Sequence, residues 1–129
     1  IPSDLKPFAN EGLINVANFL KKINNDRKIF NMEPVQLLGV VPTKIQTAAK
    51  FVQYTLPKMV KTVEERYGFK VLESYIFDRR DVSAAIEQVG NLDIPNPQSV
   101  LDYKPDSQSA QEFHDLAHEI LKLINYHQQ

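Results

Sequence analysis

Four charged residues stand in a row directly after an apolar segment of this chain. Asp78, Arg79, Arg80 and Asp81 follow Val71–Phe77, whose β-branched and aromatic residues indicate a strand. The carboxyl ends of strands in a parallel α/β sheet face the ligand crevice, so these side chains are placed to contact a ligand. In the alternative interpretation, Asp81 caps a short helix and the two arginines are solvated or paired with the aspartates.

A second turn invites the same reasoning. Val35–Val41 is nearly continuous apolar sequence, too short for a globular helix and typical of a strand buried on both faces. Pro42, Thr43 and Lys44 follow it, and a nucleobase or ribose could rest against this turn. A simple strand exit is the competing interpretation.

Cations populate the long helix predicted from Thr47 to Tyr67. Contacts to a nucleic-acid backbone need only an array of positive charges, so this face could bind DNA without reading bases. Solvated charge is the competing explanation, since it is common on helix surfaces. The residues concerned are Lys50, Lys58, Lys61, Arg66 and Lys70.

Two motifs that would define a catalytic or metal site are missing from the sequence. With only 4 glycines, neither GxxxxGK[ST] nor GxGxxG can be written, so no phosphate-cradling loop is present. His114 and His118 are four residues apart on the last predicted helix, a spacing that suits a shared metal. Both lie off the apolar stripe and neither HExxH nor HxxEH is matched, so we expect exposed histidines, no metal site and no catalytic residue.

Composition and charge describe an ordinary soluble domain with an uneven charge distribution. The chain has 129 residues, 43% of them hydrophobic and 24% charged, with no cysteine. No apolar run approaches the roughly 20 residues that cross a bilayer, so we expect a cytoplasmic protein without membrane contact. Residues 1–80 carry 13 basic and 8 acidic side chains, whereas residues 81–129 carry 2 and 8. Such asymmetry permits a basic face that meets phosphate groups.

Helical spacing places the remaining elements around the two predicted strands. A helix beginning near Pro7 turns Leu13, Val16, Ala17, Leu20 and Ile23 inward, and the 47–67 helix has its stripe at Val52, Leu56, Met59 and Val63. Pro57 should kink that helix, and Gly68 suits the position after its end. A short helix runs from Asp81 to Gly90, the Pro-rich stretch Leu92–Pro105 argues against regular structure, and Ser109 with Glu112 resembles a capping box for a last helix that begins near Ser107.

The predicted order is α-β-α-β-α-α, in which every link between strands passes through a helix, so the strands should be parallel. Ile1–Leu5 reads like a strand exit that runs into a turn. Two strands cannot cover helices on both faces of a layer. We therefore expect an α/β fold, part of a doubly wound, mostly parallel sheet with flanking helices, and residues 1–129 as the carboxy-terminal part of a larger nucleotide-binding domain.

Three segments carry a resemblance to a known family. Ile1–Leu13, Leu38–Lys44 and Ser99–Ala110 resemble the ParA-type partition ATPases of the ParA/MinD group of deviant P-loop enzymes. The similarity covers essentially the whole chain, but only the carboxy-terminal half of that family. The lysine-rich phosphate loop KGGxGKT and the acidic strand that serves magnesium would precede Ile1.

The resemblance implies a P-loop NTPase-like fold that lacks its P-loop half, in a protein that hydrolyses ATP with Mg²⁺. It implies ATP-dependent homodimers that bind DNA nonspecifically on the nucleoid, segregate plasmids, chromosomes or other cargo, and respond to a partner protein that stimulates hydrolysis. By position, it implies base-side roles for Pro42, Thr43, Lys44, Phe77 and Asp78. It also implies DNA contacts by Arg79 or Arg80, to which the residues themselves add Lys58 and Lys61.

A different class of function fits the same residues. In this alternative, the chain is a non-enzymatic α/β interaction domain. It binds an acidic partner through Arg79, Arg80 and the 47–67 helix, without any dependence on nucleotide.

Overall fold

The computed structural model describes residues 1–87 and 98–128 of the chain. Helices dominate these described residues, with 60% of them in helix and 7% in strand. The elements in chain order are β1 (Pro2–Ser3), α1 (Pro7–Ile29), β2 (Val41–Pro42), the π-helical turn η1 (Phe51–Thr55), α2 (Leu56–Glu65), α3 (Arg80–Glu87), α4 (Val100–Tyr103) and α5 (Gln108–Gln128).

The sheet is a single parallel pair. β1 pairs with β2 in the register Pro2 to Val41 and Ser3 to Pro42. On the other side of β2, the predicted strand Val71–Phe77 runs parallel but makes only isolated bridges, from Val40 to Val71 and from Ile45 to Phe77. The parallel direction was predicted correctly, but the extent of the strands was not.

Pro42 accounts for the interruption between these two bridges. Leu72 N–H donates to the Val40 carbonyl at 2.8 Å, and Ile76 N–H donates to the Pro42 carbonyl at 2.8 Å. Between them, Pro42 has no N–H to offer, so the ladder loses the bond that would join the two rungs. The 71–77 segment bends away there and returns at Ile76.

The expected fold class is therefore wrong for this chain. A doubly wound, mostly parallel sheet with flanking helices would need several strands of ordinary length, and the described residues form one sheet of two strands. Val35–Val41 keeps only its last residue in β2, and Val71–Phe77 is not a strand. Both apolar runs are extended, but backbone pairing does not extend along them. Val40 and Val71 lie in the core, whereas Val35 and Leu37 are exposed, so the predicted burial of Val35–Val41 on both faces is wrong.

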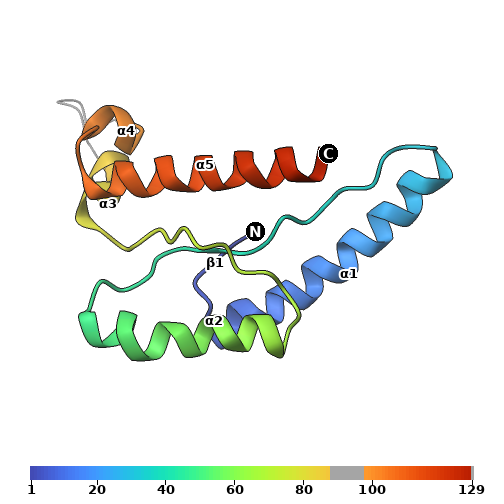
Figure 1. Ribbon diagram of the computed structural model, residues 1–129, viewed down its shortest axis with the longest axis horizontal. Helices are drawn as coiled ribbons and strands as arrows, with labels where there is room; N and C mark the ends of the chain where they lie inside the picture. The colour runs from blue at the N-terminus through green and yellow to red at the C-terminus, as the bar shows by residue number, and fades with distance from the viewer. Residues whose placement is uncertain (88–97, 129) are drawn as a thin grey trace.

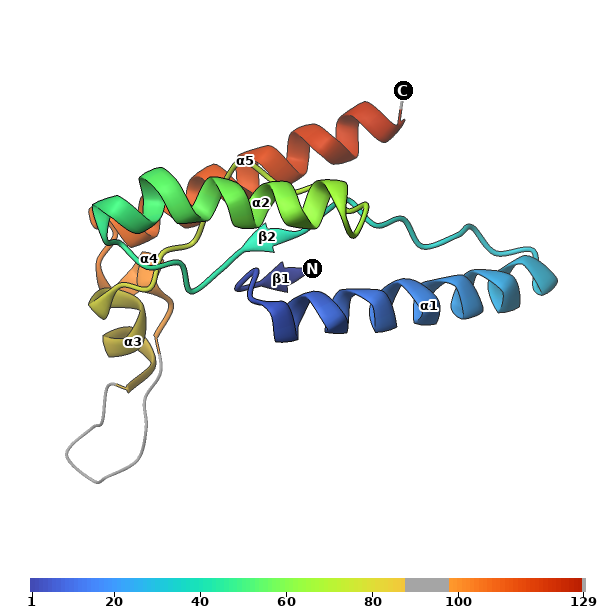
Figure 2. The same ribbon diagram turned by 90° about the horizontal axis from the view of Figure 1, so that it is seen from below.

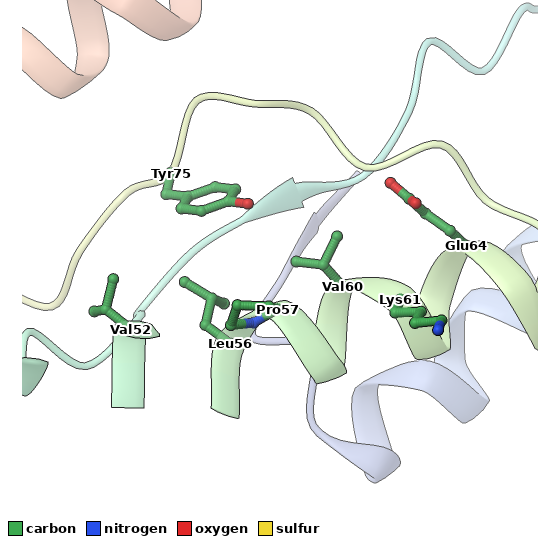
Figure 3. A pocket seen from close by; sticks show the side chains of 7 residues that line it. All are labelled: Val52, Leu56, Pro57, Val60, Lys61, Glu64 and Tyr75. Carbon is green, nitrogen blue, oxygen red and sulfur yellow. The ribbon is translucent and has the colours of Figure 1, made fainter. Parts of the chain in front are cut away.

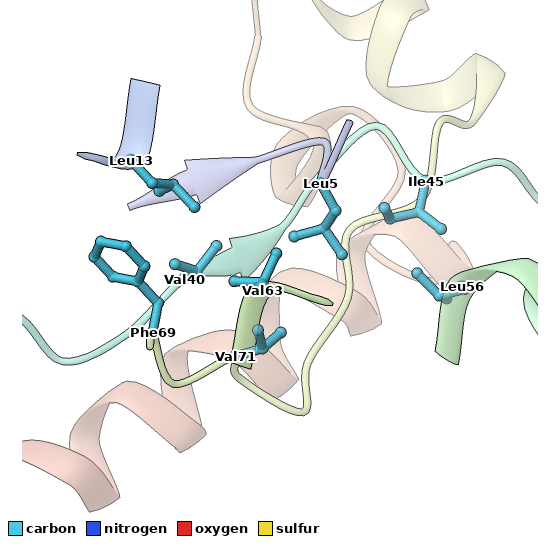
Figure 4. Close-up of a cluster of buried hydrophobic side chains, with 8 residues drawn as sticks. All are labelled: Leu5, Leu13, Val40, Ile45, Leu56, Val63, Phe69 and Val71. Atoms are coloured by element: carbon cyan, nitrogen blue, oxygen red, sulfur yellow. The ribbon is translucent and has the colours of Figure 1, made fainter. Parts of the chain in front are cut away.

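The core lies where α1, α2 and the extended segments meet (Figure 4). Leu13 of α1 and Val63 of α2 are buried in it together with Val40. Its members are Leu5, Leu13, Val40, Ile45, Leu56, Val63, Phe69 and Val71. Figure 1 shows α5 along one side of the extended segments and α2 along the other, and in Figure 2 β1 lies between α2 and α1.

The inward stripe predicted for the 47–67 helix is confirmed, because all four of its residues lie in the core cluster or pack against it. The stripe predicted for α1 is confirmed only in part, because Val16, Leu20 and Ile23 are half-buried and do not belong to the cluster. Leu13 and Ala17 of α1 face the core cluster, and so do Leu56 and Val63 of α2. The kink expected at Pro57 takes the form of the π-helical turn η1 immediately before it. The α-helix α2 begins at Leu56, so Pro57 stands in its first turn, where no intrahelical N–H donor is required.

Gly68 adopts the positive φ expected after a helix end, at 75°. Phe69 N–H then donates to the Val63 carbonyl at 3.2 Å, and the Phe69 ring enters the core. The glycine thus turns the chain sharply from α2 into the extended segment.

Two expectations near the carboxyl end are wrong. The stretch Leu92–Pro105 contains the one-turn helix α4, capped by Ser99, whose Oγ accepts from Leu101 N–H at 3.1 Å. The cap of α5 is Ser107, not Ser109: Ala110 N–H donates to Ser107 Oγ at 3.1 Å. The short helix α3 begins at Arg80, as expected to within a residue, and its predicted end at Gly90 lies outside the described residues.

Candidate functional site

A cavity of about 540 Å³ lies where the two predicted ligand turns come together. Thr43 and Lys44 line it from the turn after β2, and Phe77 and Asp78 line it from the end of the second extended segment. Pro42 is buried and does not line it. The remaining lining residues are Pro2, Val41, Ile76, Val82, Ser83, Phe113 and Leu116.

Backbone hydrogen bonds hold the two turns side by side. Thr43 N–H donates to the Ser3 carbonyl at 2.8 Å, which ties the first turn to β1. Asp78 N–H donates to the Ile45 carbonyl at 2.8 Å, which ties the second turn to the first. Lys44 sits between these bonds in the left-handed region, with φ 54°. Such a conformation is costly for a residue with a side chain and persists where the surroundings impose it, as at ligand sites.

Phe77 supplies an aromatic surface to the cavity. Its ring makes an edge contact with Tyr75, with ring centroids 6.4 Å apart. The Arg79 guanidinium lies over the same ring, 5.2 Å from its centroid. An apolar cavity with a few polar groups at its rim is the usual form of a small-molecule site, and its volume is within the range of such sites.

The two arginines that follow this turn have different environments. Arg79 Nε donates to Glu112 Oε2 at 2.9 Å, and the two side chains are 28% and 14% exposed. Arg80 is exposed at the start of α3. Asp81 pairs with Lys104, whose Nζ lies 2.7 Å from Asp81 Oδ1, and this hydrogen bond raises the pKa of Lys104. Among these charges, Arg80 is therefore the one most accessible to an incoming anion.

A second, polar hollow of about 360 Å³ adjoins these arginines. Arg79 and Arg80 line it together with Asp78 and Asp81, so opposite charges share its wall. Thr47, Ser107 and Gln108 complete it.

The lysines predicted to contact DNA lie on another helix. Lys58 and Lys61 are both exposed on α2. Lys61 Nζ is 3.8 Å from Glu65 Oε1, an i,i+4 pair in which both side chains are about two-thirds exposed or more. A pair so open to solvent restrains the lysine very little, so it stays free to meet a phosphate.

A groove of about 290 Å³ runs between α2 and Tyr75 (Figure 3). Val52, Leu56 and Val60 form its apolar wall, and Lys61 and Glu64 stand further along it. Burial raises the pKa of Tyr75, and the carboxylates of Glu64, Glu73 and Glu119 raise it further. The Tyr75 hydroxyl therefore stays protonated here and can donate a hydrogen bond.

His114 and His118 are exposed on α5. Within residues 1–87 and 98–128, no group of three or more histidine, aspartate or glutamate side chains is arranged to hold a metal ion. Over the same ranges, no helix combines the length and apolarity needed to cross a membrane.

Sequence reasoning missed the two glutamates that hold the second extended segment. Glu112 Oε1 accepts from Phe77 N–H at 3.0 Å, in addition to its bond with Arg79. Glu119 Oε1 and Oε2 accept from Glu73 N–H at 2.6 Å and Ser74 N–H at 3.2 Å. The two glutamates are seven residues apart on α5, so they share a face. The seven-residue spacing of these two glutamates on the predicted last helix was the one signal in the sequence that could have indicated their shared role.

Comparison with known proteins adds no neighbour to this description. No protein family, no curated protein and no solved structure matches the chain.

Proposed function

We propose that this chain forms the base-side and DNA-contacting part of a ParA-like ATPase. Such an enzyme segregates or positions DNA or another cellular cargo through ATP-dependent dimerisation, and a partner protein stimulates its hydrolysis. It would act in the cytoplasm, on the nucleoid.

One observation carries this proposal. Four of the five residues given a base-side role, Thr43, Lys44, Phe77 and Asp78, line one cavity although they come from two separate turns. Phe77 and its apolar neighbours suit the flat face of adenine. The threonine hydroxyl, the lysine ammonium and the aspartate carboxylate suit the polar edge of the base and its ribose.

The rest of the nucleotide would be held by residues that this sequence does not contain. The chain has no phosphate loop, and the described residues contain no group of three or more acidic or histidine side chains arranged to hold a metal ion. When bound in the intact enzyme, ATP with Mg²⁺ would supply the phosphoryl group that is transferred to water. This chain's own share is to bind and orient the base.

DNA contact is the second part of the proposal. Arg80, Lys58 and Lys61 are exposed, and their charge would meet phosphates of any sequence. The same cations would also suit an acidic protein partner. The alternative, a non-enzymatic interaction domain, therefore differs from this proposal in one prediction: it requires no nucleotide binding.

The deciding experiment is an NMR titration of the ¹⁵N-labelled chain with adenosine and with ATP. We expect the amide signals of Thr43, Lys44 and Asp78 to shift in both titrations, with dissociation constants of about 1 mM because the phosphates lack their loop. Ser83→Trp, which fills the cavity from an exposed lining position, should abolish the shifts.

Gln111→Trp is the matched control, an exposed polar residue of α5 that does not line the cavity. It should leave the shifts intact. Absence of any shift at these amides would remove the nucleotide part of the proposal and favour the interaction domain.

A further inference from the structure

Helix α1 and the residue that follows its last turn present three phenylalanines in a line on the exposed side: Phe8 and Phe19 lie in the helix and Phe30 is its C-cap. Phe8, Phe19 and Phe30 are 88%, 61% and 74% exposed. They recur every eleven residues, which is close to three helical turns and displaces each ring by only about 20° from the one before. We call Phe8, Phe19 and Phe30 the phenylalanine stripe. It runs along the whole helix, over about 33 Å.

The stripe lies opposite the side of α1 that faces the core. Leu13 is buried and Ala17 packs against the core cluster, roughly half a helical turn away from Phe8 and Phe19. Gly12, on the stripe side, would find nothing within 4 Å of an added Cβ. Figure 2 shows the far part of α1 extending beyond the other helices and strands, with the segment that follows α1 running back along one side of it. Asn24 holds that segment through two hydrogen bonds with the Val35 backbone.

The exposed rings supply a large part of the area that an interface needs. A stable interface takes about 800 Å² from each partner. The three aromatic rings alone contribute on the order of 400 Å² per copy.

We propose that the phenylalanine stripe is a self-association surface on which a second copy of this chain docks through its own α1, antiparallel to the first. The stripe is symmetric about Phe19, since Phe8 and Phe30 are each eleven residues away. A two-fold axis at Phe19 therefore places Phe19 against its own copy and Phe8 of each chain against Phe30 of the other. Self-complementarity of this kind is the requirement of a two-fold interface.

Charge favours the antiparallel orientation. The amino-terminal half of α1 carries Glu11, and the carboxyl-terminal half carries four cations against Asp26. Antiparallel pairing brings each acidic end towards the basic end of the other copy, and it also opposes the two helix dipoles. Parallel pairing would instead place the two copies of Lys22, the cation of α1 nearest to the stripe, side by side.

This association needs no nucleotide, so it does not rest on the proposed function. Sedimentation equilibrium of the full chain without nucleotide should show a monomer–dimer equilibrium. Phe19→Asp should weaken dimerisation by about 100-fold, because it places two carboxylates at the centre of the interface.

Ile14→Asp is the matched control, since Ile14 is 47% exposed but lies about two-fifths of a turn away from the stripe. It should change the dimerisation constant by no more than about two-fold. Circular dichroism of both variants shows whether they keep their helices. A monomeric wild-type chain at all concentrations overturns the proposal, and so does an equal effect of the two substitutions in folded proteins.

Cysteine cross-linking gives an independent readout, because the chain has no cysteine of its own. Phe19→Cys should form a disulfide-linked dimer rapidly on mild oxidation, since the two-fold axis brings position 19 against itself. Asn25→Cys, also exposed on α1 but off the stripe, should not. Equal cross-linking at both positions would contradict the antiparallel arrangement.

Discussion

The Glu112 carboxylate holds Arg79 and the Phe77 backbone at the same time. Oε2 accepts from Arg79 Nε at 2.9 Å and Oε1 accepts from Phe77 N–H at 3.0 Å. α5 is thereby fastened to the turn that lines the cavity. Arg79 is committed to this contact, and its neighbour Arg80 is exposed.

Replacing Glu112 tests how much this contact stabilises the fold. Glu112→Ala should lower the free energy of unfolding by about 1–3 kcal/mol, because Phe77 N–H and Arg79 both lose their partner. Glu112→Gln keeps one carbonyl oxygen as an acceptor and should cost less. Urea unfolding measures both. Asp115→Ala, an exposed position on the same helix, is the control and should lower the free energy of unfolding by about 0.5 kcal/mol or less. If Glu112→Ala lowers it no more than Asp115→Ala does, the Glu112 contact does not stabilise the fold.

The two arginines should differ in their effect on DNA binding. Arg80→Ala should weaken binding to unrelated duplexes alike and reduce the salt dependence of the affinity by about one phosphate contact. Arg79→Ala should instead lower stability, because Arg79 is held by Glu112 and lies over Phe77. Fluorescence anisotropy at several salt concentrations separates the two. Loss of binding to one sequence only, in Arg80→Ala, would exclude a backbone contact.

Gly39 should tolerate no side chain. Its φ is 155°, and an added Cβ would overlap the Leu72 side chain and lie 2.9 Å from the Lys70 carbonyl oxygen. Gly39→Ala should therefore destabilise the protein by about 2–4 kcal/mol, measured by thermal or urea unfolding. Gly68→Ala is the comparison, because its φ of 75° is also unfavourable but nothing lies within 4 Å. Gly68→Ala should lower the free energy of unfolding by about 1–2 kcal/mol. An equal loss at the two positions would contradict an added steric cost at Gly39.

Tyr75 should make the protein less stable at alkaline pH. Burial, together with Glu64, Glu73 and Glu119, raises the pKa of Tyr75 above its ordinary value of 10.0. The folded state thus keeps a proton that the unfolded chain releases first. The stabilisation is present below the ordinary pKa and is lost as pH rises through the folded pKa.

Tyr75→Phe should flatten this alkaline decline of the unfolding midpoint, and ultraviolet absorption of the phenolate should show a tyrosine that titrates late in the wild type only. Tyr54→Phe, which alters a tyrosine 60% exposed, should leave the decline unchanged. If the Tyr75→Phe protein still shows a tyrosine that ionises at unusually high pH, that titration belongs to another tyrosine and the prediction fails.

Much of the candidate site was predictable because polar residues that follow apolar runs are a local signal. Thr43, Lys44 and Asp78 were picked out in this way, Phe77 was added only by the family resemblance, and all four line a single cavity. Pro42 satisfies the same local pattern, but it is buried and interrupts a backbone ladder instead. The missing N–H of Pro42 affects backbone pairing only because the 71–77 segment lies beside it, and the sequence does not show that neighbour.

Local chemistry in the sequence by itself determined the positions of α1, α2, α3 and α5, the apolar face of α2 and the turn at Gly68. Side-chain periodicity and glycine's freedom of φ act within a few residues, so they can be read along the chain. Only the tertiary structure decided how far the extended segments pair, that Ser107 rather than Ser109 caps α5, and that Glu112 holds Arg79 while Arg80 is exposed. These outcomes depend on which donor is hydrogen-bonded to which acceptor, and the two hydrogen-bond partners of Glu112 are 33 and 35 residues away in the sequence. The order of residues along the chain does not by itself show that groups so far apart in the sequence lie within hydrogen-bonding distance in the folded protein.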